Sequence, residues 1–194
     1  KVAKKNLEGF DNCIFINSSA EELELIDNSQ DFGYSLGALH HIQNTELSLL
    51  NCVKKLKTGA PFLLYLYYKF DNRSFLFQFL WKVSDILRLF ISSMPFQIKK
   101  FITSIIAIFI YFPLSRLSKL LEKLNIKYNW VPLSFYRDSS LYTLRTDSLD
   151  RFGTKIEKRY KKQEIMKMME ECGLEDIHFS ENEPYWIALG YKRK

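Results

Sequence analysis

Two adjacent histidines, His40 and His41, follow a short apolar segment at 32–36. A neutral imidazole, with an ordinary pKa of about 6.5, can take a proton from a hydroxyl or an amine. The apolar segment is predicted to be a strand, and open α/β sheets bind ligands at the carboxyl ends of their parallel strands. His40 and His41 are therefore candidates for a general base. The alternative is that one histidine caps the next helix while the other packs against the core.

A second group of polar side chains follows the most apolar part of the sequence. It contains Tyr136, Arg137, Asp138, Arg145 and Asp147. A guanidinium group can bind a carboxylate or a phosphate through two parallel hydrogen bonds. One interpretation is that Tyr136, Arg137 and Arg145 recognise an anionic substrate, with an aspartate orienting them. The other is an ion-pair network that fixes this segment to the core.

The segments around the histidines have the order strand, helix, strand. Asn44 or Thr45 can cap a helix whose apolar residues recur at helical spacing, and Gly59 can end it. The continuous apolar run at 62–68 is then predicted to be a central strand that is covered on both faces. Tyr68 stands where that strand ends, at the predicted ligand edge, and is a candidate for substrate binding.

The order and spacing of these segments resemble one protein family. The sequence DFGYSLGALHH at 31–41, followed by LKTGAPFLLYL at 56–66, is similar to the middle of class I S-adenosylmethionine-dependent methyltransferases of the type 11-like group. The segment EECGLEDIHF at 170–179 is similar to the start of their C-terminal hairpin. The resemblance covers residues 1–68 and 160–194. It implies an α/β fold with a Rossmann-like sheet, and S-adenosylmethionine as the cofactor.

The resemblance also implies roles for individual residues. Ser35, Leu36 and Gly37 correspond to the strand end that lines the methionine part of the cofactor. Ser19 and Ala20 correspond to the loop that contacts the adenine, with a serine in place of the usual acidic residue. The histidine pair stands where the family faces its methyl acceptor. No metal ion is implied.

The resemblance further points to a missing N-terminal part. These methyltransferases begin with a strand, a glycine-rich turn of the DxGxGxG type and a second strand that ends in an acidic residue. The seven glycines of this chain are scattered and form no such turn. We therefore expect a sheet that is incomplete at its N-terminal side. The segment 13–17 would be a strand without its usual neighbours, and this chain would bind the cofactor weakly or not at all.

The remaining sequence is predicted to be a mainly helical insertion at 69–150, placed between a partial core at 1–68 and a C-terminal part at 151–194. The expected helices are 75–91, 101–112 and 114–124, followed by a loop-rich stretch at 130–155. The longest uncharged run, at 101–115, is shorter than the roughly 20 residues that span a bilayer. Three options stay open for it: an internal lid, a dimer contact, or an interfacial helix flanked by Lys99, Lys100 and Arg116.

Charge is distributed unevenly along the chain. Residues 69–162 contain 18 Lys and Arg against 7 Asp and Glu, a net charge of +11, whereas the remainder has a net charge of −5. A basic segment favours an anionic acceptor or an anionic membrane surface. The basic run at 158–162 is interpreted as a solvated helix start and not as a nucleic-acid site. Three cysteines without a CxxC pair indicate buried thiols in a reducing cytoplasm.

The leading hypothesis is a cytoplasmic methyltransferase. It would act on a hydroxyl or an amine of a small, lipid-linked or saccharide-linked anionic acceptor. The segments YLYYKFDNR and RTDSLDRFGT resemble a bacterial subgroup with such acceptors. Peripheral membrane contact through the insertion and homo-oligomerisation are further expectations. The alternative is a non-catalytic remnant of the fold that binds a membrane or a partner.

Overall fold

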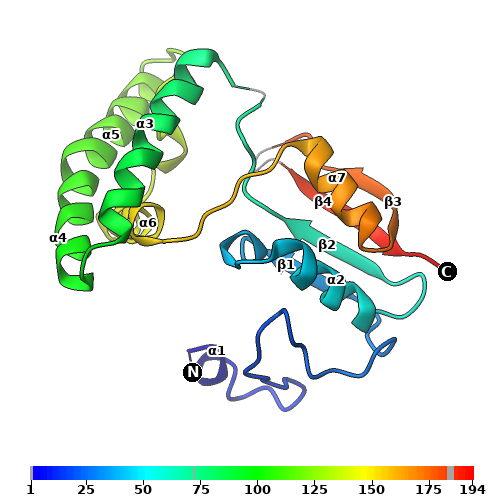
Figure 1. Ribbon diagram of the computed structural model, residues 1–194. Coiled ribbons are helices and arrows are strands. Elements are labelled where there is room, and N and C mark those ends of the chain that lie inside the picture. The colour runs from blue at the N-terminus through cyan, green and yellow to red at the C-terminus, as the bar shows by residue number, and fades with distance from the viewer. Residues whose placement is uncertain (1, 72, 183–185) are drawn as a thin grey trace. The chain divides into compact units, whose positions relative to one another are not determined.

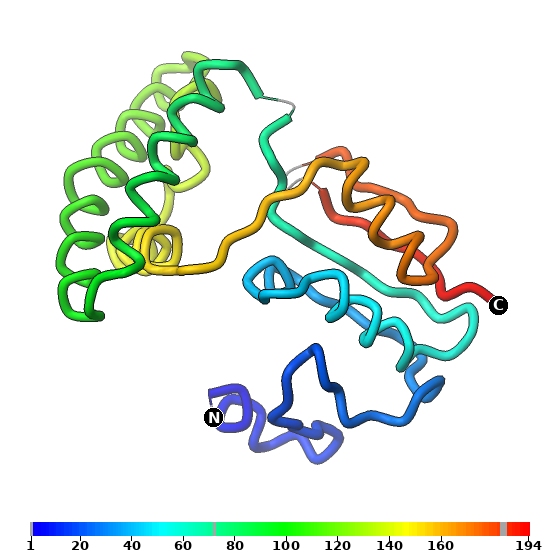
Figure 2. Tube along the Cα trace, in the orientation of Figure 1, coloured from blue at the N-terminus to red at the C-terminus, as the bar shows by residue number. Residues whose placement is uncertain are grey.

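The computed structural model describes residues 2–71, 73–182 and 186–194. The chain forms two compact units. We call residues 1–69 with 158–194 the sheet unit and residues 70–157 the helical unit. The chain leaves the sheet unit after its second strand and returns before its last helix (Figures 1 and 2). The helical unit is therefore an insertion within the sequence of the sheet unit.

The sheet unit contains a four-stranded mixed sheet with the order β1-β2-β4-β3. Its strands are β1 (Gly33–Leu36), β2 (Pro61–Tyr65), β3 (Leu174–Phe179) and β4 (Ile187–Lys192). β1 and β2 are parallel, whereas β4 is antiparallel to both β2 and β3. Helix α2 (Thr45–Lys55) connects the parallel pair, and α7 (Lys162–Glu171) precedes the C-terminal hairpin (Figure 1). A helical crossover between parallel strands and a terminal antiparallel hairpin is the arrangement that the resemblance implies.

The core of the sheet unit lies between β2 and the helices α2 and α7. Leu49 and Val53 of α2 belong to the same buried cluster as Phe62 and Leu64 of β2. Along β2, buried residues alternate with half-buried ones. The strand is therefore fully covered on one face and half covered on the other, so the predicted cover of both faces is complete on one face only. The physical reason is that α2 and α7 lie on the same face of the sheet (Figure 1).

The segment 13–17 forms no strand in the described chain, which contradicts the expectation. It lies in an irregular stretch between α1 (Val2–Asn6) and β1, and the Ile14 side chain is 88% exposed. A strand needs a neighbour to pair its backbone groups, and no strand of the described chain pairs with this segment. β1 is consequently an edge strand, as expected for an incomplete sheet.

The helical unit contains the helices predicted in the insertion, and it adds one more. Its elements are α3 (Phe75–Ser92), α4 (Phe96–Ile106), the π-helical turn η2 (Ala107–Tyr111), α5 (Phe112–Lys123), the short 3-10 turn η3 (Ser134–Tyr136) and α6 (Leu141–Gly153). No break occurs at Pro113, because it lies in the first turn of α5, where a missing N–H group is tolerated.

Helices α4, η2 and α5 form one continuous helix, Phe96–Lys123, of 28 residues. By length and composition alone, this helix could cross a membrane. The expectation that this region is too short to span a bilayer rested on the uncharged run at 101–115, and the helix extends beyond that run at both ends. The turn at η2 holds one extra residue, which changes the side of the helix on which later residues lie.

Helix α6 occupies much of the stretch that was predicted to be a loop, so that prediction is wrong over 141–153. Ser140 caps the helix, since its Oγ accepts a hydrogen bond from Thr143 N at 3.1 Å. Leu144 and Phe152 are buried in the core of the helical unit. Two buried apolar residues among many polar ones gave too weak a helical pattern to be recognised.

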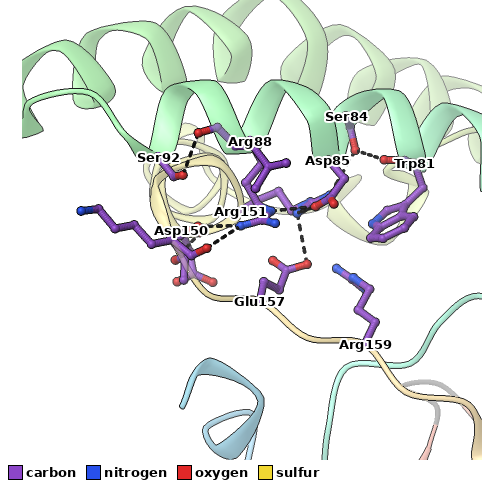
Figure 3. Close-up of polar contacts among 12 residues, drawn as sticks. Trp81, Ser84, Asp85, Arg88, Ser92, Asp150, Arg151, Glu157 and Arg159 are labelled. Atoms are coloured by element: carbon purple, nitrogen blue, oxygen red, sulfur yellow. Dashed lines mark hydrogen bonds and ion pairs between the residues drawn. The ribbon is translucent and has the colours of Figure 1, made fainter. Parts of the chain in front are cut away.

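Polar side chains fix α6 to α3 (Figure 3). Arg88 is only 4% exposed, and its Nε donates to Asp85 Oδ1 at 2.7 Å. Its Nη1 donates to two backbone carbonyls just after α6, at 3.0 and 3.1 Å. Arg151 lies between Asp85 and Glu157, and its Nη1 is 3.1 Å from a Glu157 carboxylate oxygen. The Arg151–Asp85 ion pair, at 3.5 Å, and the Arg88 bonds to the carbonyls after α6 therefore hold the two helices together.

Candidate functional site

The chain turns sharply where β1 ends. Gly37 has a φ of +67°, a left-handed conformation that favours glycine. Its N–H group donates to Tyr65 O at 3.0 Å. The 3-10 turn η1 (Leu39–His41) follows and closes with a hydrogen bond from Ile42 N to Leu39 O at 3.2 Å. This turn places both predicted catalytic histidines after the carboxyl end of β1.

His40 is completely buried, with 0% of its surface exposed. The centre of its ring lies 3.9 Å from that of Tyr67 and 4.1 Å from that of His41. Within the described residues, neither ring nitrogen of His40 has a hydrogen-bond partner. Burial, and then the charges of His41 and Arg159, lower the pKa of His40 to about 3. The imidazole is therefore neutral at physiological pH.

A buried neutral imidazole offers one hydrogen-bond donor and one acceptor. Buried polar atoms in native proteins are nearly always hydrogen-bonded, and a buried group without a partner costs about 1–3 kcal/mol. Ser35 on β1 shares this feature, because its Oγ is buried and has no partner among the described residues. Two such groups at one strand end indicate a site whose hydrogen-bonding partner is a ligand.

Tyrosine rings line the histidine turn. Tyr67 also meets His41 edge to face, with 5.7 Å between ring centres, and Tyr65 lies 6.0 Å from Tyr67. Burial raises the pKa of Tyr65, so its hydroxyl stays protonated and can donate a hydrogen bond. Both tyrosines come from the end of β2 and the residues just after it. The carboxyl ends of two neighbouring parallel strands therefore contribute to the site.

The segment 158–160 completes this region, and sequence reasoning missed it. Lys158 N donates to His40 O at 3.0 Å, and Tyr160 N donates to Tyr67 O at 2.9 Å. The guanidinium carbon of Arg159 lies 5.0 Å from the centre of the Tyr67 ring. The interpretation of this run as a solvated helix start is wrong, because α7 begins only at Lys162. The position of this segment depends on its pairing with residues that are distant in the sequence, and no local sequence pattern reveals such a pairing.

Hydroxyl groups hold the histidine turn onto α2. The Tyr160 hydroxyl donates to Thr45 Oγ1 at 3.0 Å, and Thr45 Oγ1 donates to Leu39 O at 3.1 Å. Asn44 caps α2, as one of the two predicted capping residues, by accepting from Leu47 N at 3.0 Å. The turn is thus fixed by both α2 and the segment 158–160.

The loop that carries Ser19 and Ala20 is tied to the first turns of α2. Glu21 Oε1 accepts from Asn44 N at 3.1 Å, and Glu21 O accepts from the side-chain amide of Asn51. Ser19 Oγ accepts from Glu21 N at 3.2 Å, whereas Ala20 packs against the core. The loop position is therefore set by α2, and the Ser19 hydroxyl is engaged in a local turn.

The structure collects several predicted site residues at one end of the sheet unit. Ser35, Leu36 and Gly37 end β1, the histidine pair follows, and Tyr68 comes after β2. The Tyr68 carbonyl accepts from Arg159 Nη1 at 3.3 Å.

The three other predicted acceptor-binding residues lie in the helical unit, where each has a partner. Arg137 Nε donates to Glu122 Oε1 at 2.9 Å. Arg145 donates to Ser104 Oγ from two nitrogens, at 3.2 and 3.3 Å. Tyr136 hydrogen-bonds a carboxylate of α6. Such contacts are those expected of an ion-pair network that fixes this segment to the core. Acceptor binding by Tyr136, Arg137 and Arg145 stays a prediction.

Comparison with known proteins bears on the N-terminal third of the chain. Residues 1–64 match a family model described as "Methyltransferase domain". The resemblance to class I methyltransferases is confirmed. The α/β, Rossmann-like methyltransferase fold is confirmed with it. No curated protein sequence matches the chain.

Several solved structures of the same kind are similar to this chain. One is an S-adenosylmethionine-dependent methyltransferase of Thermotoga maritima, described as a possible histamine N-methyltransferase (13% identity, TM-score 0.44, 92% of this chain and 63% of that one). Another is a candidate methyltransferase of Bacillus halodurans (15%, 0.48, 92% and 51%). A third is the complex of the Haloferax volcanii Trm112 methyltransferase activator with a candidate methyltransferase (11%, 0.45, 98% and 67%). The chain thus spans less than two thirds of the length of the first two, and the family model matches residues 1–64.

S-adenosylmethionine is the cofactor that this methyltransferase family implies. The buried Ser35 hydroxyl and the left-handed turn at Gly37 fit the polar methionine end of that molecule. Contact between the adenine and the loop at Ser19 and Ala20 stays a prediction. The glycine-rich turn that approaches the cofactor in the family is absent from the sequence, so these residues supply part of such a site. Within the described ranges, no cluster of three or more His, Cys, Asp or Glu side chains could hold a metal ion.

Proposed function

We propose that this chain belongs to a methyltransferase that uses S-adenosylmethionine to methylate a hydroxyl or an amine. The acceptor would be a small, lipid-linked or saccharide-linked anionic molecule, with its reacting atom beside His40. The observation that carries the proposal is the buried imidazole of His40, which has no hydrogen-bond partner among the described residues. It stands at the carboxyl end of β1, within the residues that match the methyltransferase domain. Bound cofactor supplies an already activated methyl group on a sulfonium, so alignment provides much of the rate.

The low pKa of His40 refines the role predicted for it. A base with a pKa of about 3 takes up little proton before the reaction. His40 therefore first accepts a hydrogen bond from the acceptor and orients its lone pair. The acceptor O–H or N–H becomes strongly acidic as its heavy atom bonds to the methyl carbon, and only then does the proton move to the imidazole. His40 subsequently releases the proton to water that enters as the product leaves.

The groups around His40 support this role. Tyr67 and His41 hold the imidazole in place by ring contacts on two sides. Arg159 lies over Tyr67 and disfavours a charged His40, which keeps the ring neutral until the proton arrives. A guanidinium group near the site also suits an anionic acceptor. The role of Arg159 in acceptor binding is part of the proposal.

The test compares His40→Ala with His41→Ala in the intact enzyme. Labelled S-adenosylmethionine is supplied together with acceptors from lipid and saccharide extracts. His40→Ala should lower turnover about 10²-fold or more, while cofactor affinity, measured by calorimetry, should change little. His41→Ala serves as the matched control and should lose less activity, because His41 is only half-buried. Unchanged turnover in both variants would leave the pair with a structural role.

One observation favours the second candidate function, a non-catalytic remnant that binds a membrane or a partner. Among its described residues, the helical unit exposes 26 large apolar side chains. A remnant would need this surface but no cofactor. Calorimetry with the intact protein separates the two functions. Binding of S-adenosylmethionine would support a methyltransferase, whereas no detectable binding would support a non-catalytic remnant.

A further inference from the structure

The helical unit has an inverted distribution of side chains. Among its described residues, six buried side chains are apolar and six are polar or charged, whereas 26 large apolar side chains are exposed. The buried polar set consists of Arg88, Ser92, Thr103, Ser115, Ser118 and Ser148. Helices that contact lipid turn small and polar residues toward one another and large apolar ones outward. This distribution is typical of a protein surface that faces hydrocarbon.

Helix α3 presents one continuous apolar side. Phe75, Phe79, Ile86 and Phe90 are 85, 53, 56 and 68% exposed. Their spacing of four, seven and four residues places them in one row along the helix. The opposite side of α3 carries the buried Arg88. One side of this helix therefore makes the contacts within the protein, and the other is left apolar and uncovered.

The continuous helix Phe96–Lys123 has a similar row. Phe101, Ile105 and Phe109 are 67, 41 and 74% exposed, and Leu117 and Leu120 are 41 and 54% exposed. The spacing in this row averages more than the 3.6 residues of an α-helical turn. The π-helical turn η2 contains one residue more than an α-helical turn. Leu117 and Leu120, which follow this turn, therefore lie on the same side of the helix as Phe101.

The two apolar rows lie on one surface of the helical unit. α3 turns Arg88 toward α6, as the bonds to the carbonyls after α6 show (Figure 3). The long helix turns Thr103 toward α6, because Thr103 O accepts from Ser148 Oγ at 2.9 Å. Since both helices bury the side that faces α6, their exposed sides face away from it. We call these rows on α3 and Phe96–Lys123 the apolar surface.

Positive charge accompanies the apolar surface. The helical unit contains 13 Lys and Arg against 7 Asp and Glu, a net charge of +6. Lys82 of α3, Lys100 of α4 and Lys123 of α5 are exposed, and no ion pair is recorded for them within the described residues. Long lysine side chains can reach from an apolar face to lipid headgroups. Each cation near an anionic membrane surface strengthens binding about five-fold.

We propose that the helical unit binds the surface of an anionic lipid bilayer through this apolar surface. The long helix lies in the plane of the membrane and does not cross it. Its other side is committed to polar contacts: Lys99 Nζ donates to Gly153 O at 3.2 Å, and Arg116 donates to two backbone carbonyls at 2.7 Å. The proposal is independent of methyl transfer, because it rests on the helical unit alone.

The experiment is vesicle co-sedimentation of the full chain without cofactor. Mixed vesicles of phosphatidylcholine and phosphatidylglycerol are compared with vesicles of pure phosphatidylcholine, at low and at high salt. The chain should bind the mixed vesicles more tightly, and high salt should weaken that preference. Phe101→Gln combined with Phe109→Gln should reduce binding at least about ten-fold, because each ring loses the gain from burial in lipid.

Two matched controls keep the result specific. Phe10→Gln with Ile14→Gln changes two residues of the sheet unit that are similarly exposed, 59 and 88%, and should leave binding unchanged. Lys100→Glu with Lys123→Glu should reduce binding to the mixed vesicles only, whereas Lys5→Glu with Lys54→Glu, the same charge change in the sheet unit, should have a smaller effect. Circular dichroism of each variant confirms that it remains folded.

Three outcomes would overturn the proposal. If the variant with Phe101→Gln and Phe109→Gln bound vesicles as tightly as the parent chain, the apolar surface would not be part of the membrane contact. A dimer in light scattering that this variant dissociates, without vesicle binding by the parent chain, would make the surface a contact between two copies. A monomer that binds neither kind of vesicle would exclude the membrane, and loss of acceptor binding in the variant would then identify the surface as a lid.

Discussion

In the sheet unit, 14 buried residues are apolar and three are polar, whereas in the helical unit the numbers are six and six among the described residues. Each fully buried large apolar side chain contributes roughly 1.5–3 kcal/mol to folding in water. The sheet unit therefore has a core of the kind that stabilises a soluble domain. The stability of the helical unit depends more on the ion pairs and hydrogen bonds of its buried polar side chains, and on contacts that cover its exposed apolar side chains. The comparison teaches that one chain can hold two units with different sources of stability.

The largest expected effect comes from breaking the ion pairs inside the helical unit. Arg88→Ala should destabilise this unit by about 3–5 kcal/mol, because it removes the buried donor of two carbonyls and one of the two arginines that pair with Asp85. Hydrogen exchange of the α3 and α6 amides measures the loss. Lys119→Ala is the control, since its ion pair with Asp138 is exposed and should contribute less than about 1 kcal/mol. Similar losses in the two variants would contradict the comparison.

The next effect tests where apolar burial matters. Leu64→Ala should cost about 2–5 kcal/mol, because Leu64 is fully buried in the core of the sheet unit. Phe101→Ala, in the helical unit, should change stability in water by no more than about 0.5 kcal/mol, because the ring is 67% exposed. Urea unfolding of both variants gives the two values. A cost for Phe101→Ala as large as that for Leu64→Ala would mean that the apolar surface is covered within the protein.

A pH effect should be confined to the sheet unit. The pKa of His40 is lowered to about 3 in the folded state, against about 6.5 in an unfolded chain. Between these values the unfolded state binds more protons, so the His40 contribution is fully present above about pH 6.5 and is lost as the pH falls toward 3. His40→Leu should remove this part of the pH dependence of unfolding. An unchanged pH dependence in this variant would argue against a buried neutral His40.

The smallest effect concerns the hydroxyl pair that holds the histidine turn. Tyr160→Phe removes the hydrogen bond to Thr45 Oγ1 and should cost about 1 kcal/mol. Tyr34→Phe, at a site 66% exposed on β1, should be neutral. Thermal unfolding of the two variants provides the measurement. No loss in Tyr160→Phe would mean that the turn is held by its backbone contacts alone.

Elements with local signals could be predicted from the sequence. β1, α2 with its Asn44 cap, α3 and the C-terminal hairpin all formed where the sequence placed them, within one or two residues at most boundaries. Capping groups, turn glycines and apolar spacing act over a few residues, so a sequence displays them directly. α6 was missed because its buried residues are few, and Leu144 and Phe152 stand among serines, threonines and charged residues.

Features that depend on distant partners could not be predicted. The segment 13–17 has the composition of a strand, but a strand forms only beside a neighbour. The pairing of Lys158 with His40, and of Tyr160 with Tyr67, joins segments that are separated by the whole helical unit. The histidines were recognised as candidates from their types and position. The burial of His40, and with it the low pKa that changes its proposed role, arises from Tyr67 and from Arg159, which only the folded chain brings beside it.

The central claim is that the sheet unit carries a ligand site at the buried ring of His40. The most direct test is the nitrogen NMR signal of the His40 imidazole in the intact protein, followed with pH and with added S-adenosylhomocysteine. We expect a neutral ring between about pH 4 and 8 and a shift of its signal when the ligand binds. A ring that titrates at about 6.5 and does not respond to the ligand would contradict the account.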